Sequence, residues 1–213
     1  MLRAYYFMKR TIVEYLESDK KEITVEALDG EELTVVIVGL GEQGEKTVTV
    51  KVNGRGASAQ ILGIFLNKTG IQTLHTLQHH TKPDTTSDLL VKGVFFGDAT
   101  FNYDGLIRID KGAQRSNAYQ RNENLLLSPK AHVNTEPELE IEANDVRCTH
   151  GATVGKIDEE VLFYLMSRGI DRKQAEQLFI EGFLESVLGR INEVNVANKI
   201  RSEIQNKLNN LAI

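Results

Sequence analysis

The 213-residue sequence contains one cysteine, three prolines and no tryptophan. A single thiol excludes an internal disulfide and an all-cysteine metal site within one chain. No run of about 18 apolar residues is present, so the sequence predicts no transmembrane helix. The opening residues, MLRAYYFMKR, have no long apolar stretch and predict no secretory signal. We therefore expect a cytoplasmic protein without a membrane partner.

The charge balance argues against a nucleic-acid-binding protein. The net charge is −5, from 30 acidic and 25 basic residues. A protein that binds nucleic acid through a basic surface usually carries an excess of Lys and Arg. Hydrophobic residues make up 41% and charged residues 26%, which is typical of a folded globular chain. The length suits one large domain, or one domain with a smaller appendage.

The periodicity of apolar residues changes near residue 157. Residues 1–156 contain short alternating runs and predict a β-rich region, whose first part (1–70) is the least defined. Residues 157–213 predict a helical domain. Many short strands without long helices between them are compatible with a sandwich, a barrel or a solenoid. The expected strands are 23–28, 33–38, 47–52, 59–67, 73–77, 89–96, 106–110, 125–128 and 139–143.

Turn residues separate the first of these strands. Asp29-Gly30 is typical of a two-residue β-hairpin turn. The segment from Gly39 to Gly44 matches G-x-G-x-x-G, but a dinucleotide fold would need a helix directly after it. The alternating segment 47–52 follows instead, which favours a hairpin loop.

The helical region has clear start and stop signals. Asp158 and Asp171 are expected N-caps, and Gly169 and Gly189 are expected ends. A third helix is expected from about Asn192. The predicted apolar faces consist of Val161, Leu162, Leu165 and Met166; Ala175, Leu178, Phe179, Phe183 and Val187; and Ala197, Ile200, Ile204, Leu208 and Leu211.

Three histidines form a small cluster in the sequence. If the segment were helical, His75 and His79 would share a face and could bind a metal. The surroundings are extended, however, and no nearby thiolate or carboxylate completes a ligand set. The favoured interpretation is that one histidine points inward and hydrogen-bonds Thr85 or Ser87, while another is solvated.

Cys148 and His150 form a thiol–imidazole pair two residues apart. In a strand these positions share one face. An imidazolium beside a thiol lowers its pKa, which favours thiolate chemistry or metal ligation. The alternative, favoured by spacing alone, is a buried structural cysteine beside a hydrogen-bonded histidine. Two protein ligands would leave a metal half-bound, so further ligands would have to come from another chain or from small thiols.

From His80 onward the chain resembles the SufB/SufD family of iron–sulfur cluster assembly proteins. The resemblance covers about residues 73–190, and the run from Pro137 to Gly169 is the most specific part. Gly151 follows His150, giving the Cys-x-His-Gly pattern of SufD; SufB-type sequences have Glu there, and a further cysteine near Lys130. The segments that carry the resemblance are His80 with Thr85-Thr86-Ser87, Lys92-Gly93-Val94, 124–128, 137–141, 145–155 and 163–169.

The resemblance implies a mainly β fold, a right-handed parallel β-helix followed by a small C-terminal helical domain. It also implies a non-enzymatic scaffold that binds SufC, an ABC-type ATPase, through its C-terminal helices; the docking candidates are Leu178, Phe179 and Phe183. A SufB-type subunit, or a second copy, would pair with the β-helix near Cys148 and His150. No intrinsic cofactor is implied, and a transient iron–sulfur cluster shared with a partner stays open.

One departure from the family concerns length. Only about seventy residues precede the matching block, whereas family members have a longer N-terminal region and a longer β-helix. The chain is therefore either a fragment or a compact homologue.

Two other function classes remain as alternatives. One is a stand-alone metal-binding module that uses the three histidines with Cys148 and His150. The other is a carbohydrate-active β-helix enzyme, whose acidic residues would line one face of the coils. Its candidates Asp104, Asp110 and Glu140 are scattered in the sequence.

Overall fold

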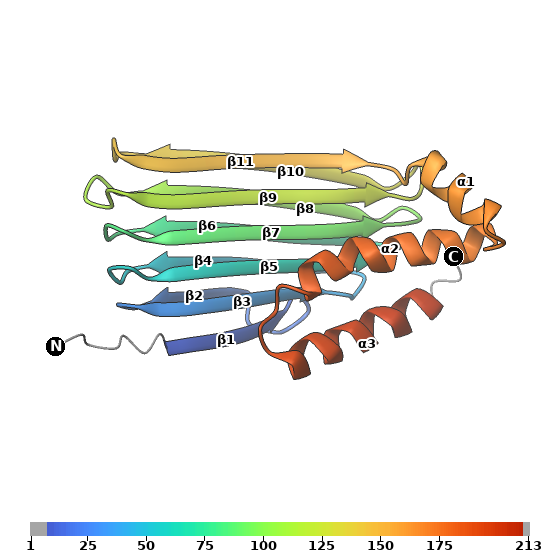
Figure 1. Ribbon diagram of the computed structural model, residues 1–213, viewed down its shortest axis with the longest axis horizontal. Coiled ribbons are helices and arrows are strands. Elements are labelled where there is room, and N and C mark those ends of the chain that lie inside the picture. Colours follow the sequence, from blue (N-terminus) through green and yellow to red (C-terminus); the bar gives the residue numbers. More distant parts are fainter. Residues whose placement is uncertain (1–7, 211–213) are drawn as a thin grey trace.

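The computed structural model describes residues 8–210, which wind into a parallel β-helix followed by three helices (Figure 1). The fold expected from the family resemblance is therefore confirmed. The strands are β1 (Met8–Tyr15), β2 (Glu22–Ala27), β3 (Glu31–Gly39), β4 (Gly44–Val52), β5 (Ser58–Asn67), β6 (Ile71–His80), β7 (Thr86–Phe95), β8 (Thr100–Ile109), β9 (Ser116–Leu126), β10 (His132–Ile141) and β11 (Val146–Gly155). The helices are α1 (Glu159–Ser167), α2 (Arg172–Leu188) and α3 (Val194–Asn210).

The strands alternate between two sheets, and within each sheet all neighbours are parallel. Sheet A has the order β1-β3-β5-β7-β9-β11, and sheet B has the order β10-β8-β6-β4-β2. The hairpin predictions are wrong, because β2 and β3 belong to different sheets, as do β3 and β4. Gly30, at φ 66°, supplies the left-handed turn that a coil corner needs as much as a hairpin does. No helix follows Gly39–Gly44, so the loop interpretation of that motif holds.

Side chains stack in rows along the inside of the solenoid. Val35, Ile61, Leu89, Gln120 and His150 lie in register on successive strands of sheet A. The first three are fully buried between the two sheets, where they form the main core. Because each coil covers the inward row of the one before it, the last coil alone has its inward row uncovered.

Aromatic rings fill the middle of this core. The ring centroid of Phe101 lies 4.7 Å from that of Phe65 and 5.1 Å from that of Phe95. Gly93 leaves the room for this stack, since a Cβ at that position would lie 2.4 Å from the Phe95 ring. The glycine is therefore a packing requirement.

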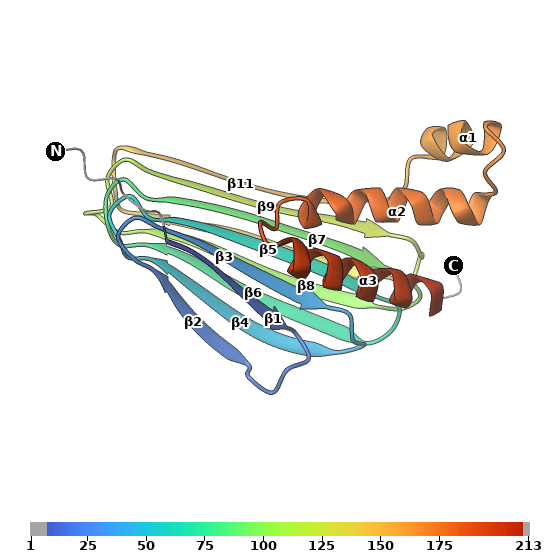
Figure 2. The same ribbon diagram turned by 60° about the horizontal axis from the view of Figure 1, so that its bottom comes forward.

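Helices α2 and α3 cover the outer face of sheet A (Figure 2). The predicted caps are confirmed: Asp158 accepts a hydrogen bond from the Glu160 amide, and Asp171 accepts one from the Gln174 amide. Gly169 ends the first helix at φ 88°. The predicted face of α2 is partly wrong, because its buried residues are Ala175, Ile180, Leu184, Val187 and Leu188.

The apolar face of α3 is confirmed for the described residues. Its buried residues are Ala197, Ile200, Ile204 and Leu208, and Leu211 lies outside the described part of the chain. No helix within residues 8–210 is long and apolar enough to cross a membrane.

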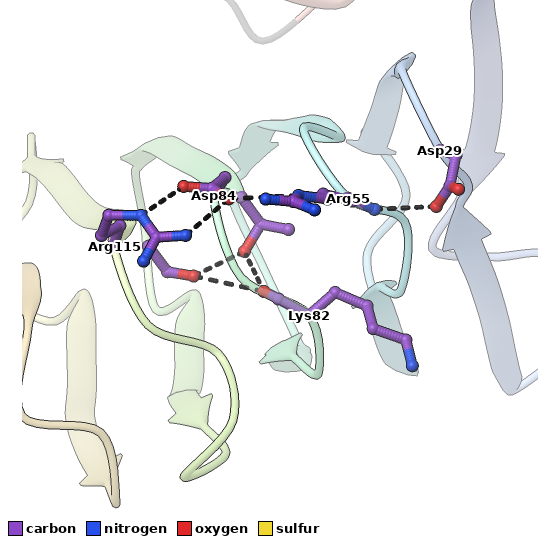
Figure 3. Close-up of polar contacts among 7 residues, drawn as sticks. Asp29, Arg55, Lys82, Asp84 and Arg115 are labelled. Carbon is purple, nitrogen blue, oxygen red and sulfur yellow. Dashed lines mark hydrogen bonds and ion pairs between the residues drawn. The ribbon is translucent and has the colours of Figure 1, made fainter.

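The coil corners opposite the helices carry a ladder of alternating charge (Figure 3). Asp29 accepts a hydrogen bond from the Arg55 amide, and the Arg55 side chain lies 3.4 Å from Asp84. Arg115 donates two hydrogen bonds to Asp84, at 2.6 and 2.8 Å, and these hold the pKa of that carboxyl below its usual range. The Arg115 amide donates to the Asp145 carbonyl. A corner residue thus links each coil to the next, and the contacts between charged side chains are those of Asp84 with Arg55 and Arg115.

Candidate functional site at the open coil and the helical face

The coil formed by β10 and β11, here called the open coil, has no further strand stacked on it within residues 8–210. Leu139 and Ile141 align with buried Ile107 and Ile109 of the preceding coil, so they face the interior, yet each is 40% exposed. Val154 on β11 is 45% exposed. Apolar side chains that face a core but stay exposed are typical of a surface that another protein covers.

Cys148 and His150 both lie on this uncovered inward row. Cys148 aligns with buried Ala118, and His150 aligns with nearly buried Gln120. The prediction that the thiol and the imidazole share one face of a strand is therefore confirmed. Cys148 packs against a small cluster that includes Ala118 and is half-buried, whereas His150 is exposed.

The electrostatics of Cys148 do not fit an activated thiolate. Burial raises the pKa of its thiol above the usual value, because a charged thiolate is poorly solvated there. The expected lowering by a neighbouring imidazolium is therefore not found in this chain alone. The structure places a neutral thiol beside an exposed imidazole at the end of the solenoid.

The three histidines of β6 do not form a site. His80 points inward and is fully buried; its two ring nitrogens lie 2.7 Å from the Thr85 hydroxyl and 2.8 Å from the Ser87 hydroxyl. His75 and His79 point outward. The inward, hydrogen-bonded histidine of the structural interpretation is confirmed, whereas His75 and His79 each contact a carboxylate instead of standing free in solvent. The residues of the stand-alone metal module are not brought together, because β6 lies in sheet B and β11 lies at the edge of sheet A. Within residues 8–210 no group of three or more His, Cys, Asp and Glu side chains could hold a metal.

The acidic residues considered for carbohydrate chemistry are engaged in ion pairs. Asp104 lies 2.8 Å from His75, and Asp110 lies 2.9 Å from His79. Glu140 lies 3.9 Å from Arg108. These contacts lie on the outer side of sheet B and do not form a pair of free carboxylates.

A second exposed apolar surface lies on the helices. Phe163 and Tyr164, both on the short helix α1, are 75% and 56% exposed. Helical periodicity alone could not find them, because α1 buries only Leu162 fully and is apolar on nearly all sides. We call this surface the α1 face; its exposed apolar residues are Val161, Phe163, Tyr164 and Met166.

The predicted docking residues on α2 separate into two kinds. Leu178 is 49% exposed and lines an open apolar groove of about 240 Å³ between α2 and α3. Phe179 and Phe183 instead pack against the core beneath the helices, and the Lys92 ammonium lies 4.2 Å from the Phe183 ring centroid. Of the three, Leu178 is the one with about half of its surface available to a partner.

These features define a scaffold-like protein, a parallel β-helix with one open end and an apolar helical appendage. The model of the family "SUF system FeS cluster assembly, SufBD core domain" matches residues 5–183. The chain belongs to this family, and among its members it is closer to SufD, as the Cys-x-His-Gly pattern predicted.

Curated relatives agree with this assignment. The iron–sulfur cluster assembly protein SufD of Escherichia coli is 32% identical over 161 residues, which are 75% of this chain and 38% of that protein. SufD of Bacillus subtilis is 38% identical over 120 residues, 56% of this chain and 28% of that protein. A SufBD family protein of Mycobacterium tuberculosis is 31% identical over 178 residues, 79% of this chain and 45% of that protein. The chain thus spans less than half the length of each of these relatives.

Proposed function

We propose that this chain is a non-enzymatic, SufD-like scaffold subunit of an iron–sulfur cluster assembly complex. The open coil would join a SufB-type subunit, and the α1 face would bind a SufC-type ATPase. The observation that carries the proposal is the open coil itself, whose inward apolar row is left uncovered by the other residues between 8 and 210. We further propose a cytoplasmic location.

The open coil supports a role beside a cluster rather than as its holder. The sequence has one cysteine, so even two copies would offer only two thiols. The raised pKa of Cys148 further disfavours the thiolate form that binds iron. A cluster would therefore be cargo, held mainly by the partner's residues, with His150 and Cys148 lining the junction.

The α1 face supports the second contact. Its aromatic residues point away from the core on a helix that packs mainly against α2, so they are free to insert into a groove on another protein. Exposed aromatic side chains of this kind often dominate the binding energy of an interface. An ATPase bound there could transmit its motion through α2, which packs directly on β7.

The test is binding of the cognate SufC-type ATPase to the full chain, measured by calorimetry. Phe163→Ser combined with Tyr164→Ser should weaken binding at least about 30-fold, because loss of even one buried interface aromatic costs about 2 kcal/mol and each 1.4 kcal/mol is about tenfold in affinity. Val194→Ser is the matched control, since Val194 is an equally exposed apolar residue (69%) at the start of α3, far from α1 (Figure 1). It should leave binding unchanged.

Two results would count against the proposal. One is no binding of the cognate ATPase by the intact chain. The other is equal loss of binding in the α1 variant and in the Val194 control, which would show that the α1 face is not the contact. Circular dichroism of each variant confirms that the fold is retained.

A further inference from the structure

The open coil carries an unbalanced set of acidic side chains on its outer side. They occupy alternate positions of β10 and the residue just after it, opposite in direction to the inward Leu139 and Ile141. All four are exposed. We call them the glutamate row: Glu136, Glu138, Glu140 and Glu142.

The rest of the chain neutralises this row poorly. Within residues 8–210, Glu140 alone of the four forms an ion pair, with Arg108 at 3.9 Å. Glu136 aligns with another carboxylate, Asp104, on the neighbouring strand. Most of the negative charge therefore faces outward at the exposed edge of sheet B.

In earlier coils, side chains of opposite charge lie next to each other on neighbouring strands of one sheet. Glu26 on β2 aligns with Lys51 on β4, 3.8 Å away. Lys92 on β7 aligns with Glu123 on β9, 2.8 Å away. The corner ladder follows the same rule, and at the open coil it ends on the acidic Asp145 (Figure 3 shows the preceding steps). Opposite charges thus meet at these steps, whereas β10 of the open coil offers only acidic side chains from Glu136 to Glu142 to a further strand.

A second copy of this chain is a poor match for that edge. If two open coils meet around a twofold axis with β10 against β10, the strands run antiparallel and glutamates face glutamates. Like charges directly opposite each other destabilise a strand pair. If β10 meets the other copy's β11 instead, the outward row there contributes one basic residue, Arg147, against four acids.

We propose that the glutamate row selects the partner of the open coil: an edge strand of a different chain that presents Lys or Arg at alternate outward positions, rather than a second copy. This inference rests on the proposed function, in which the open coil is a docking edge. The apolar inward row supplies the general attraction of the edge, and the glutamate row decides which edge is accepted.

A charge swap within this protein tests the inference without a known partner. The full-length chain and its Glu136→Lys/Glu138→Lys variant are labelled separately, and association is measured by sedimentation velocity at low salt. The mixture should associate at least about tenfold more tightly than wild type alone, because lysines of the variant then face glutamates of the wild type across the twofold junction. About 0.5 M NaCl should remove most of this advantage by screening.

The matched control is Glu22→Lys/Glu193→Lys, which changes the net charge equally at exposed sites outside the open coil. A mixture of wild type with this control should associate no more tightly than wild type alone. If it matches the Glu136→Lys/Glu138→Lys mixture, net charge explains the effect and the inference is overturned.

Two further outcomes separate the inference from the proposed function. Wild-type self-association as tight as the mixture would overturn charge selection, while the open coil would still stand as a docking edge. No association in any mixture, with all proteins folded, would overturn both.

Discussion

The two ends of the solenoid treat their exposed inward rows in opposite ways. At the first coil, formed by β1 and β2, charged side chains occupy inward positions. Glu14 aligns with buried Ile37, and the fully buried Lys46 ammonium lies 3.2 Å from Glu14 and 2.6 Å from the Ser18 hydroxyl. In the open coil neither β10 nor β11 has Asp, Glu, Lys or Arg at an inward position, and the inward Leu139 of β10 is apolar and 40% exposed.

The difference concerns how well each end of the described solenoid is suited to pairing with another strand. Inward-pointing charges on an edge make it unsuitable for pairing with another strand, and the first coil satisfies those charges internally. The open coil has no such charges on its inward rows, and the charges on the outer side of β10 are all acidic from Glu136 to Glu142. Of the two end coils described, the open coil is therefore the one without inward charges that would oppose strand pairing.

The comparison is tested most strongly by truncating matched residues in neighbouring coils. Ile107→Ala should lower the free energy of unfolding by about 4 kcal/mol, since a fully buried side chain leaves a cavity. Leu139→Ala, its register partner in the open coil, should cost about 1 kcal/mol, because 40% of that side chain is already exposed. Urea denaturation measures both. Equal losses would show that the open coil is packed like an inner one.

The second prediction concerns the first coil and its buried ion pair between Lys46 and Glu14. Lys46→Met should destabilise the fold by about 3 kcal/mol, because Glu14 is left without its partner in a mostly buried site. Adding Glu14→Gln should recover much of that loss. Lys51→Met, which removes an exposed pair with Glu26, should cost less than about 0.5 kcal/mol. If Lys46→Met lowered the free energy of unfolding no more than Lys51→Met, the buried ion pair would not stabilise the first coil as proposed.

Between the ends, the interior tolerates polar groups only when they are neutral. Burial, with a smaller effect of His79, lowers the pKa of His80 to about 4, against 6.5 when unfolded. A lowered histidine pKa gives stability that is fully present above pH 6.5 and is lost as the pH falls toward 4. The loss should reach about 2 kcal/mol by pH 5. Urea midpoints between pH 8 and pH 5 measure it.

The matched control for this pH dependence is His75→Gln, on the outer side of β6. It should retain the steep loss of stability, whereas His80→Gln should flatten it, whatever its effect at pH 8. A profile that is unchanged in His80→Gln would assign the acid sensitivity to other groups.

The smallest expected effect concerns the thiol of the open coil. Cys148 should react with iodoacetamide severalfold more slowly than free cysteine at pH 8, because burial raises its pKa. His150→Ala should leave the rate nearly unchanged. A marked slowing in that variant would show that the imidazole activates the thiol after all.

Much of the fold could be predicted from the sequence where local chemistry and tertiary structure agree. The caps at Asp158 and Asp171, and the inward His80, follow from side chains that have few alternatives. The coil connections could not be predicted, because Asp29-Gly30 suits a hairpin and a solenoid corner equally well. Strand β1 was missed because its alternation is interrupted by Lys9 and Arg10.

Only part of the candidate site could be predicted from the sequence, for the same reason. The shared face of Cys148 and His150 follows from strand geometry alone. Whether that face is covered depends on the number of coils stacked on it, which no local pattern encodes. The exposure of Phe163 and the burial of Phe179 likewise depend on how α1 and α2 lie on sheet A.

The alternating corner ladder also limits how such a solenoid can change its length. Deleting the single coil that carries Asp84 would bring Arg55 next to Arg115, so two guanidinium groups would meet where an acid and a base now pair. Deleting two adjacent coils would restore the alternation. Shortening or lengthening by even numbers of coils is thus the electrostatically permitted step.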